Sequence, residues 1–177
     1  MKHLYYFLYY HFAIHLPESY SRPFGKLGMQ IRYQLCKRIF KTCGRGVNIE
    51  HGANFGRGDR IEIGDNSGLG INCVVPNGAI IGKNVMMGPN CFIVSVNHRY
   101  DDVNIPMNQQ GVTSSMPVII EDDVWIGRDV TIMRGRHIKK GSVIAACTVL
   151  TKDFPEYSVV GGNPSKVIKN RLGDKNI

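Results

Sequence analysis

The feature that most constrains this chain is a six-residue spacing of large apolar side chains. In the C-terminal half the spacing runs without interruption through Ile120, Ile126, Ile132, Ile138, Ile144 and Leu150. Apart from an insertion after Phe55, an earlier run keeps it through Ile49, Phe55, Ile63, Leu69, Val75, Ile81, Met87 and Ile93. A hexapeptide period is the sequence signature of a parallel β-helix. The period therefore predicts an all-β coil of short parallel strands.

A second inward position lies two residues before each large one. In the uninterrupted run these positions hold Val118, Val124, Val130, Arg136, Ser142 and Thr148, of which Arg136 alone does not suit an interior. Glycine often follows the large residue, and we expect it to supply the φ values that a sharp corner needs. Three hexads per turn predict rungs of about eighteen residues and a triangular cross-section. Most parallel crossovers are right-handed, so the period alone would favour that hand.

The composition suits a single domain in a reducing compartment. With 177 residues, 43% of them hydrophobic, the chain can bury its own core. The 5 cysteines lack CxxC or zinc-like spacing, and three take inward positions, which predicts free core thiols and no metal. The N-terminal apolar run is too short to span a membrane, and no signal-peptide cleavage site follows it. We therefore expect a cytoplasmic protein.

The positive charge is concentrated in residues 1–46, which hold eight of the Lys and Arg residues and one acid, Glu18. Such asymmetry predicts an anionic partner surface, and a membrane or an acidic glycan is favoured over nucleic acid because the repeat region lacks a binding motif. Residues 25–42 place Leu27, Ile31, Leu35 and Ile39 at spacing four and predict an amphipathic basic helix. This helix is expected to cap the first rung, with peripheral contact to anionic lipid as an addition.

The expected organisation is an aromatic and basic helical segment over 1–46 and a β-helix over 47–177. A long loop over 97–117 interrupts the coil after Ile93, and loops of this length are usually functional or disordered. Residues 153–177 are expected to cap the other end with a short basic helix that carries Lys166 and Lys169.

Several motifs make the chain resemble a known family over about residues 47–171. They are the hexads, the DDVWIG turn at 122–127, the pair Asn97 and His98, and the ending TKDFPEYSVVGGNPSKVI. Together they are similar to the maltose/galactoside O-acetyltransferase group of hexapeptide-repeat acyltransferases. The loop resembles those of sugar acetyltransferases in surface-polysaccharide pathways. The resemblance implies a left-handed β-helix, acetyl-CoA as cosubstrate, and a homotrimer with active sites between parallel prisms.

Acetyl transfer to a hydroxyl needs a base with a pKa near 7, which imidazole provides. His98 is the candidate because it opens the loop, whereas the other histidines lie in the N-terminal segment, on the first coil or, for His137, in a turn. Asp101 or Asp102 could orient the imidazole, as could a backbone carbonyl, and both acids are also candidates for acceptor binding. By resemblance Asn72 binds the acceptor, although a plain turn residue is the alternative reading.

The resemblance also implies a track for the coenzyme. The N–H of Arg128 would stabilise the oxyanion, and Trp125 would line the pantetheine arm unless it is a subunit contact. The further residues of the implied track are Ala145, Ala146, Thr151, Lys152, Lys166 and Lys169, the last two near the 3′-phosphate.

Two other readings of the repeat remain open, and one is excluded. A γ-type carbonic anhydrase needs three histidine ligands, and no HxxxxH spacing occurs. A xenobiotic acetyltransferase and a noncatalytic β-helix scaffold remain alternatives. The reading that fits best is an acetyl-CoA-dependent O-acetyltransferase acting on a sugar hydroxyl in capsule, O-antigen or exopolysaccharide synthesis. The basic N-terminus suggests a lipid-linked acceptor.

Overall fold

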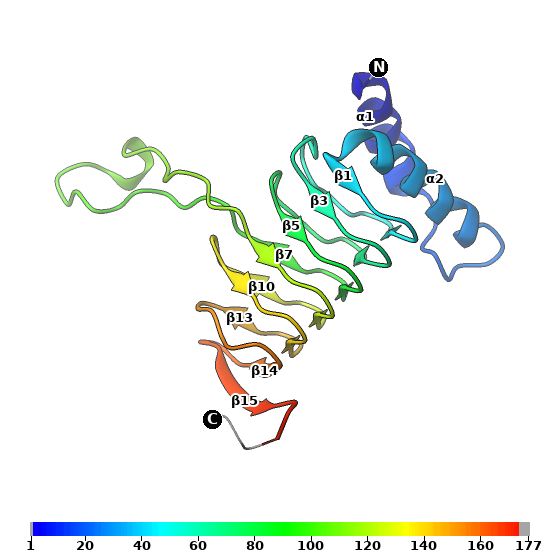
Figure 1. The fold of residues 1–177 in the computed structure, drawn as a ribbon. Helices are drawn as coiled ribbons and strands as arrows, with labels where there is room; N and C mark the ends of the chain where they lie inside the picture. Colours follow the sequence, from blue (N-terminus) through cyan, green and yellow to red (C-terminus); the bar gives the residue numbers. More distant parts are fainter. Residues whose placement is uncertain (1, 174–177) are drawn as a thin grey trace.

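The structure, a computed structural model, describes residues 2–173 as a three-faced parallel β-helix with helices at its N-terminal end (Figure 1). Face 1 consists of β1 (Thr42–Cys43), β3 (Glu62–Ile63), β5 (Ile80–Ile81), β8 (Ile119–Ile120) and β11 (His137–Ile138). Face 2 consists of β2 (Asn48–Ile49), β4 (Gly68–Leu69), β6 (Met86–Met87), β9 (Trp125–Ile126), β12 (Val143–Ile144), β14 (Ser158–Gly161) and β15 (Lys166–Asn170). Face 3 consists of β7 (Phe92–Ile93), β10 (Thr131–Ile132) and β13 (Val149–Leu150), extended by bridges at Asn54 and Val74.

The hexad prediction is confirmed by the interior of the coil. The large hexad residues are buried, with Ile120, Ile126 and Ile132 at most 1% exposed. Stacked partners lie eighteen residues apart where no insertion intervenes, as in the pairs 62 with 80 and 131 with 149. Arg136, the one residue unsuited to an inward position, is only partly buried, and its Nη1 donates to the carbonyl of Thr151 at 3.1 Å.

The corners bear out the expectation about glycine in part. Positive φ angles occur three residues after the inward position and are taken by glycine at some corners, such as Gly78 and Gly135, and by Asn or Asp at others, such as Asn72 at 54° and Asp129 at 57°. Gly88 and Gly127, which directly follow an inward residue, are needed for another reason. A Cβ there would lie 2.6 Å from a backbone nitrogen of the next rung. Glycine directly after the inward residue therefore permits close stacking at Gly88 and Gly127, and Gly, Asn or Asp makes the turn two residues later.

Three elements form the helical cap on the first rung: α1 (Lys2–His11), the short 3₁₀ helix η1 (Ala13–His15) and α2 (Gly25–Ile39) (Figure 1). The face predicted for α2 is confirmed at its C-terminal end, where Ile39 is buried and Leu35 packs against the core, and is wrong at its N-terminal end, where Leu27 and Ile31 are 53% and 38% exposed. The helix instead turns Gly25, Gly28, Arg32, Cys36 and Ile39 inward. Strand β1 pairs with β3, so strand pairing begins ahead of the boundary expected at residue 47. No helix within residues 2–173 has the length and hydropathy to cross a membrane.

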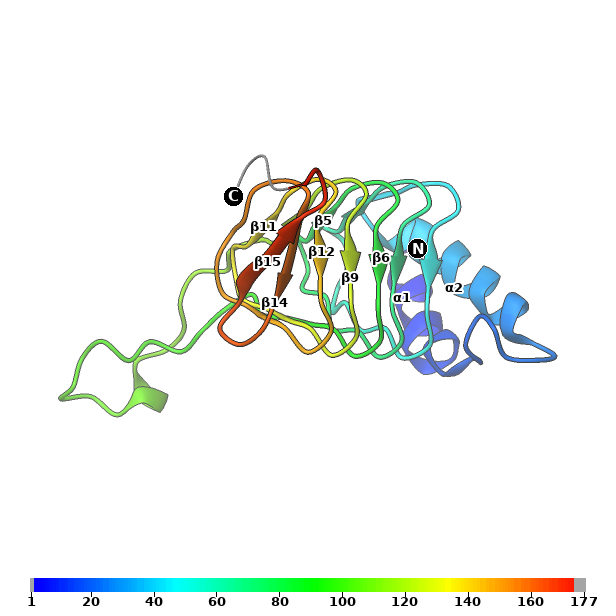
Figure 2. The same ribbon diagram turned by 90° about the horizontal axis from the view of Figure 1, so that it is seen from below.

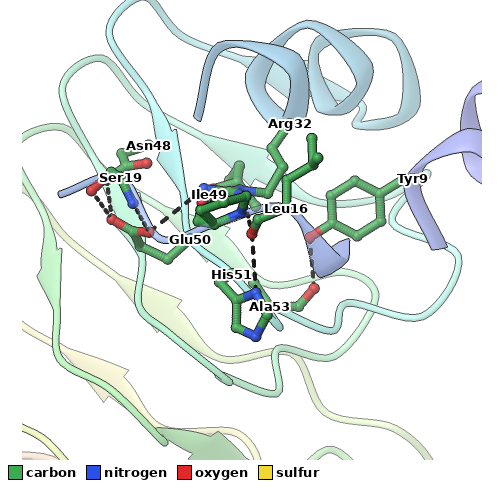
Figure 3. Close-up of polar contacts among 10 residues, drawn as sticks. Tyr9, Leu16, Ser19, Arg32, Asn48, Ile49, Glu50, His51 and Ala53 are labelled. Carbon is green, nitrogen blue, oxygen red and sulfur yellow. Dashed lines mark hydrogen bonds and ion pairs between the residues drawn. The ribbon is translucent and has the colours of Figure 1, made fainter. Parts of the chain in front are cut away.

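A buried polar cluster fastens the cap to the coil (Figure 3). Arg32 is 0% exposed, and its guanidinium donates to the carbonyls of Ile49, Leu16 and Pro17. Its Nη2 lies 3.7 Å from Oε2 of Glu50. These contacts explain the rotation of α2, because a buried guanidinium has to meet acceptors.

An arm of residues 94–117 leaves the coil after β7 and projects well beyond the prism (Figures 1 and 2). At its base the two strands of the arm run antiparallel, with a bridge between His98 and Val112. The 3₁₀ helix η2 (Met107–Gln109) lies near its tip. The predicted interruption of the coil is therefore an extended arm whose outgoing and returning segments meet in one antiparallel bridge.

The C-terminal cap differs from the short basic helix that was expected. Residues Lys166–Asn170 form β15, which pairs antiparallel with β14 on face 2. The two strands lie side by side at the end opposite the helices (Figure 2). A strand satisfies the open edge of β14 through backbone hydrogen bonds, which a helix at this place could not do.

Candidate functional site

Six of the residues predicted for the coenzyme gather on face 2 and its border with face 3. An outward row crosses face 2 in register through Met86, Trp125, Val143, Val159 and Lys169. Trp125 is 52% exposed, as expected for an outward position between the buried Val124 and Ile126. We call Trp125, Arg128, Ala145, Ala146, Lys166 and Lys169 the face group.

A β-bulge in β15 brings Lys166 and Lys169 to the same side of the sheet. In β15 Lys169 pairs with Val159 and Lys166 with Gly161, while the register shifts between Val159 and Val160. Residues three apart on a regular strand would point to opposite faces, and one extra residue restores the same face. Lys166 and Lys169 therefore lie on the outer side of face 2, together with Trp125.

The corner between faces 2 and 3 leaves backbone donors free. Within the described chain the N–H groups of Ile71, Arg128 and Ala146 have no protein acceptor. At the corner between faces 1 and 2 the N–H of Lys83 donates to Oδ1 of Asp122 at 2.7 Å, while those of Asp65 and Asp122 also have no protein acceptor among residues 2–173. Small residues leave the backbone accessible at the corner between faces 2 and 3. Gly127 stacks so closely on Ala146 that a Cβ at position 127 would lie 2.6 Å from the backbone nitrogen of Ala146.

Three further predicted residues lie along the corner between faces 3 and 1. The arm that carries His98 leaves at the end of β7, and Thr151 and Lys152 follow β13, the last strand of the same sheet. We call His98, Thr151 and Lys152 the edge group. The hydroxyl of Thr151 lies 3.2 Å from that of Ser165, which directly precedes Lys166. The last rung thus connects the two groups.

His98 stands at the base of the arm with an exposed side chain. The strand partners of the arm hold the backbone beside it, because the N–H of Arg99 donates to the carbonyl of Gly111 at 3.0 Å. Neither carboxylate predicted to orient His98 is hydrogen-bonded to it in residues 2–173. Asp102 instead accepts from the N–H of Asn104 at 2.9 Å, and Asp101 is exposed.

Two arginines of the edge were not among the predicted site residues. Nη1 of Arg134 donates to the carbonyl of Ser114 in the returning strand of the arm at 3.2 Å. Nε of Arg136 contacts the carbonyl of Arg134, and its Nη1 bonds the carbonyl of Thr151. They link the arm to the Thr151 corner. The only signal in the sequence was the unsuitable arginine at an inward hexad position.

Asn72 lies apart from the edge group, at the corner between faces 2 and 3. Its φ of 54° matches that of the other corner residues, such as Asn90 and Asp129. A turn requirement therefore accounts for the residue type. A role in acceptor binding stays a prediction.

His137 has a different environment from the turn that was expected. It lies in β11 on face 1, where its Nε2 is 2.7 Å from Oε1 of Glu121. The N–H of Lys140, followed by His137 and Lys139, holds the pKa of Glu121 below its ordinary value. This ion-pair cluster ties two rungs together. Among residues 2–173 no group of three His, Cys, Asp or Glu side chains could hold a metal ion.

The fold is a three-faced parallel β-helix built on hexapeptide repeats. The sequence matches the family described as bacterial transferase hexapeptide (six repeats) over residues 60–95 and 117–152, on either side of the arm. A galactoside O-acetyltransferase from Lactococcus lactis subsp. lactis is 31% identical over 144 residues, which are 80% of this chain and 68% of that protein. The chain belongs to the hexapeptide-repeat acetyltransferases, and the predicted resemblance is confirmed.

Other relatives extend this picture. The crystal structure of a hexapeptide-repeat acetyltransferase from Vibrio cholerae O1 biovar eltor, complexed with acetyl coenzyme A, has a TM-score of 0.71 at 30% identity and covers 86% of this chain and 80% of that chain. A probable acetyltransferase from Mycobacterium tuberculosis is 42% identical over 91 residues, 51% of this chain and 30% of that protein. The chain spans between 30% and 58% of the length of three such curated relatives.

Proposed function

We propose that the protein is an acetyl-CoA-dependent O-acetyltransferase that acts on a sugar hydroxyl. The observation that carries the proposal is the alignment of Trp125, Lys169 and Lys166 on one outer face, beside the free N–H of Arg128. The relative named galactoside O-acetyltransferase and the relative complexed with acetyl coenzyme A support the acceptor class and the donor.

The residues of the face group fit the coenzyme. Trp125 offers an exposed flat surface for the pantetheine arm, and the small Ala145 and Ala146 leave the backbone within reach of its amides. Lys166 and Lys169 supply positive charge for phosphate. Thr151 and Lys152 extend the track through Ser165. When bound, acetyl-CoA supplies the acetyl group as a thioester.

In this proposal His98 takes the proton from the acceptor hydroxyl as that oxygen attacks the carbonyl carbon of the thioester. The new C–O bond forms, the C–S bond breaks, and the leaving sulfur of coenzyme A receives the proton back from His98. The N–H of Arg128 donates to the oxygen on which negative charge develops. Asp101 and Asp102 remain candidates for contact with the acceptor, because the arm exposes both beside His98. Asn72 is a further candidate for acceptor binding.

The separation of the two groups within one chain supports a homotrimer. The edge group and the face group lie at different corners of the prism, and the arm extends outward towards any neighbour (Figure 2). In the proposed trimer the edge group of one copy faces the face group of the next, as in heterologous interfaces that close into rings. Each active site would then contain residues from two copies.

We further propose that the acceptor belongs to capsule, O-antigen or exopolysaccharide synthesis and that the reaction takes place in the cytoplasm. The five free cysteines support a reducing compartment. A panel of free sugars, activated sugars and antibiotics bearing hydroxyl groups, assayed with labelled acetyl-CoA, identifies the acceptor class. Acetylation of an antibiotic in preference to every sugar would favour a xenobiotic acetyltransferase instead.

The central test is the substitution His98→Ala, because loss of a general base typically slows a reaction by about 10²–10⁴-fold. We expect kcat to fall at least 100-fold while the dissociation constant for acetyl-CoA, measured by calorimetry, changes little. His137→Ala is the matched control, since His137 lies on face 1 in an ion-pair cluster and should retain activity. Activity of the His98 variant within tenfold of the parent would remove the assignment.

A further inference from the structure

The helical cap carries apolar side chains that the described part of the chain, residues 2–173, leaves substantially exposed. The N-cap residue of α2, Phe24, and two residues within the helix, Leu27 and Ile31, follow one another at helical spacing and are 62%, 53% and 38% exposed. On α1 the pair Leu4 and Phe7 is 58% and 49% exposed. Residues three or four apart share one side of a helix. Each helix of the cap therefore presents an apolar side to its surroundings.

The inner sides of both helices are committed to the coil, which fixes the orientation of the exposed sides. The hydroxyl of Tyr9 donates to the carbonyl of Ala53 at 2.7 Å, and its ring lies 4.5 Å from that of Phe55. Arg32 anchors α2 by donating to the carbonyl of Ile49 in the coil and to the carbonyl of Leu16 in the segment between the two helices. In addition, a Cβ on Gly28 would lie only 3.0 Å from the carbonyl oxygen of Pro17. Neither helix can turn its apolar stripe inward without losing these contacts.

The link between the helices, residues 12–24, adds aromatic side chains to the same end of the molecule. Phe12 and Tyr20 are 60% and 70% exposed. The rings of Phe7 and Phe12 lie 6.3 Å apart, so the exposed residues of α1 continue into the link. Aromatic residues of this kind favour the boundary between water and an apolar phase.

The charge of the cap identifies what this surface would contact. Residues 1–46 contain one acid, Glu18, against eight Lys and Arg residues. Arg32 is buried beside Glu50, while Lys2, Arg22, Lys26 and Lys37 are exposed. Exposed apolar and aromatic residues surrounded by cations are the pattern by which amphipathic helices lie on anionic lipid.

We infer that α1, α2 and the link between them form a docking surface for an anionic lipid bilayer, with Phe24, Leu27 and Ile31 entering the headgroup region. The cap lies at one end of the prism and β15 at the other (Figure 1). Docking would hold the prism end-on, with the face group towards water. If the proposed function holds, this arrangement favours an acceptor sugar carried by a membrane lipid.

The test measures cosedimentation of the full chain with vesicles of phosphatidylcholine that contain about one third phosphatidylglycerol, at low salt. We expect the parent protein to bind these vesicles and to bind vesicles of phosphatidylcholine alone at least fivefold less. The double substitution Leu27→Gln with Ile31→Gln should reduce binding at least fivefold. Glutamine forms helices nearly as well as leucine, so circular dichroism should show an unchanged fold.

The matched control is Ile80→Thr, which removes an isoleucine of similar exposure, 39%, from face 1. Its vesicle binding should equal that of the parent. Equal binding of the α2 variant and the parent, or equal binding to both lipid mixtures, would overturn the proposal. A lower mass of the α2 variant in light scattering would assign the surface to a contact between copies. These readouts do not depend on acetyltransferase activity.

Discussion

Asn72 occupies a corner where the backbone alone explains the residue type. Its positive φ is shared with the residues at equivalent corners, and asparagine tolerates this conformation better than most side chains. The same residue is the candidate that resemblance assigns to the acceptor. Structure and sequence thus give it two roles that only a measurement can separate.

The substitution Asn72→Gly separates them, because glycine adopts a positive φ freely but has no amide side chain. We expect the melting temperature to stay within a few degrees of the parent and the KM for the sugar acceptor to rise about tenfold, the effect of one lost hydrogen bond of ~1.4 kcal/mol. Asn90→Gly at the next rung is the control. An unchanged KM would assign Asn72 to the turn alone.

At the scale of elements, α2 shows how a buried charge can override an apolar pattern. Its spacing of leucine and isoleucine predicts one inner face, yet Arg32 and the small residues Gly25 and Gly28 form the contact. Glu50 completes that contact, since the N–H of Ser19 donates to its Oε2 at 3.0 Å and Nδ2 of Asn48 to its Oε1 at 2.8 Å. The cap is therefore held by polar contacts that depend on ionisation.

The contact between the helical cap and the coil should depend on pH through Glu50. Burial raises the pKa of Glu50, but hydrogen bonds from Ser19 and Asn48 and the charge of Arg32 outweigh it and hold the pKa below its ordinary value of 4.5. Stability from these contacts is complete above that value and is lost as the pH falls through the lowered pKa. We expect Glu50→Gln to reduce the free energy of unfolding by about 2 kcal/mol at pH 7.

The difference between parent and variant should shrink below pH 4.5, because the carboxylate is protonated first in the unfolded chain and then, as the pH falls through the lowered pKa, in the folded chain as well. Urea denaturation followed by circular dichroism at several pH values measures it. Glu62→Gln is the control, because this carboxylate pairs with Lys41 at the surface and should contribute little at any pH. A difference that stays constant from neutral to acid pH would contradict the role given to Glu50.

At the scale of the whole molecule, one chain presents the two groups of the proposed site at separate corners. The edge group lies between faces 3 and 1, and most of the face group lies on face 2. Pairing of these parts between copies can be tested with two inactive variants. His98→Ala disables the first part, and the double change Lys166→Glu with Lys169→Glu disables the second.

Random association of the two variants, unfolded and refolded together, should restore about a quarter of the parental activity, because one pairing in four joins two intact parts. Refolded alone, each variant should stay inactive. Sedimentation velocity should show the same trimeric mass for all samples. If both parts came from the same chain, the mixture would remain as inactive as its components.

Much of the site could be anticipated from sequence because its residues are fixed by the coil. Trp125 follows an inward valine, so its outward position was determined by the period, and the location of His98 was set by the end of a strand. The same orientation of Lys166 and Lys169 could not be anticipated. It depends on a register shift between β14 and β15 that forms only when the two strands pair.

The sequence by itself determined the coil, its rung length and its interior, because a six-residue period repeats the same local choice of inward and outward positions in every rung. Tertiary structure alone decided the rotation of α2, the form of the C-terminal cap and the role of the corner glycines. Each of these depends on groups far apart in the chain. Arg32 has to find carbonyl acceptors, the edge of β14 has to be paired, and stacked rungs leave no room for a Cβ.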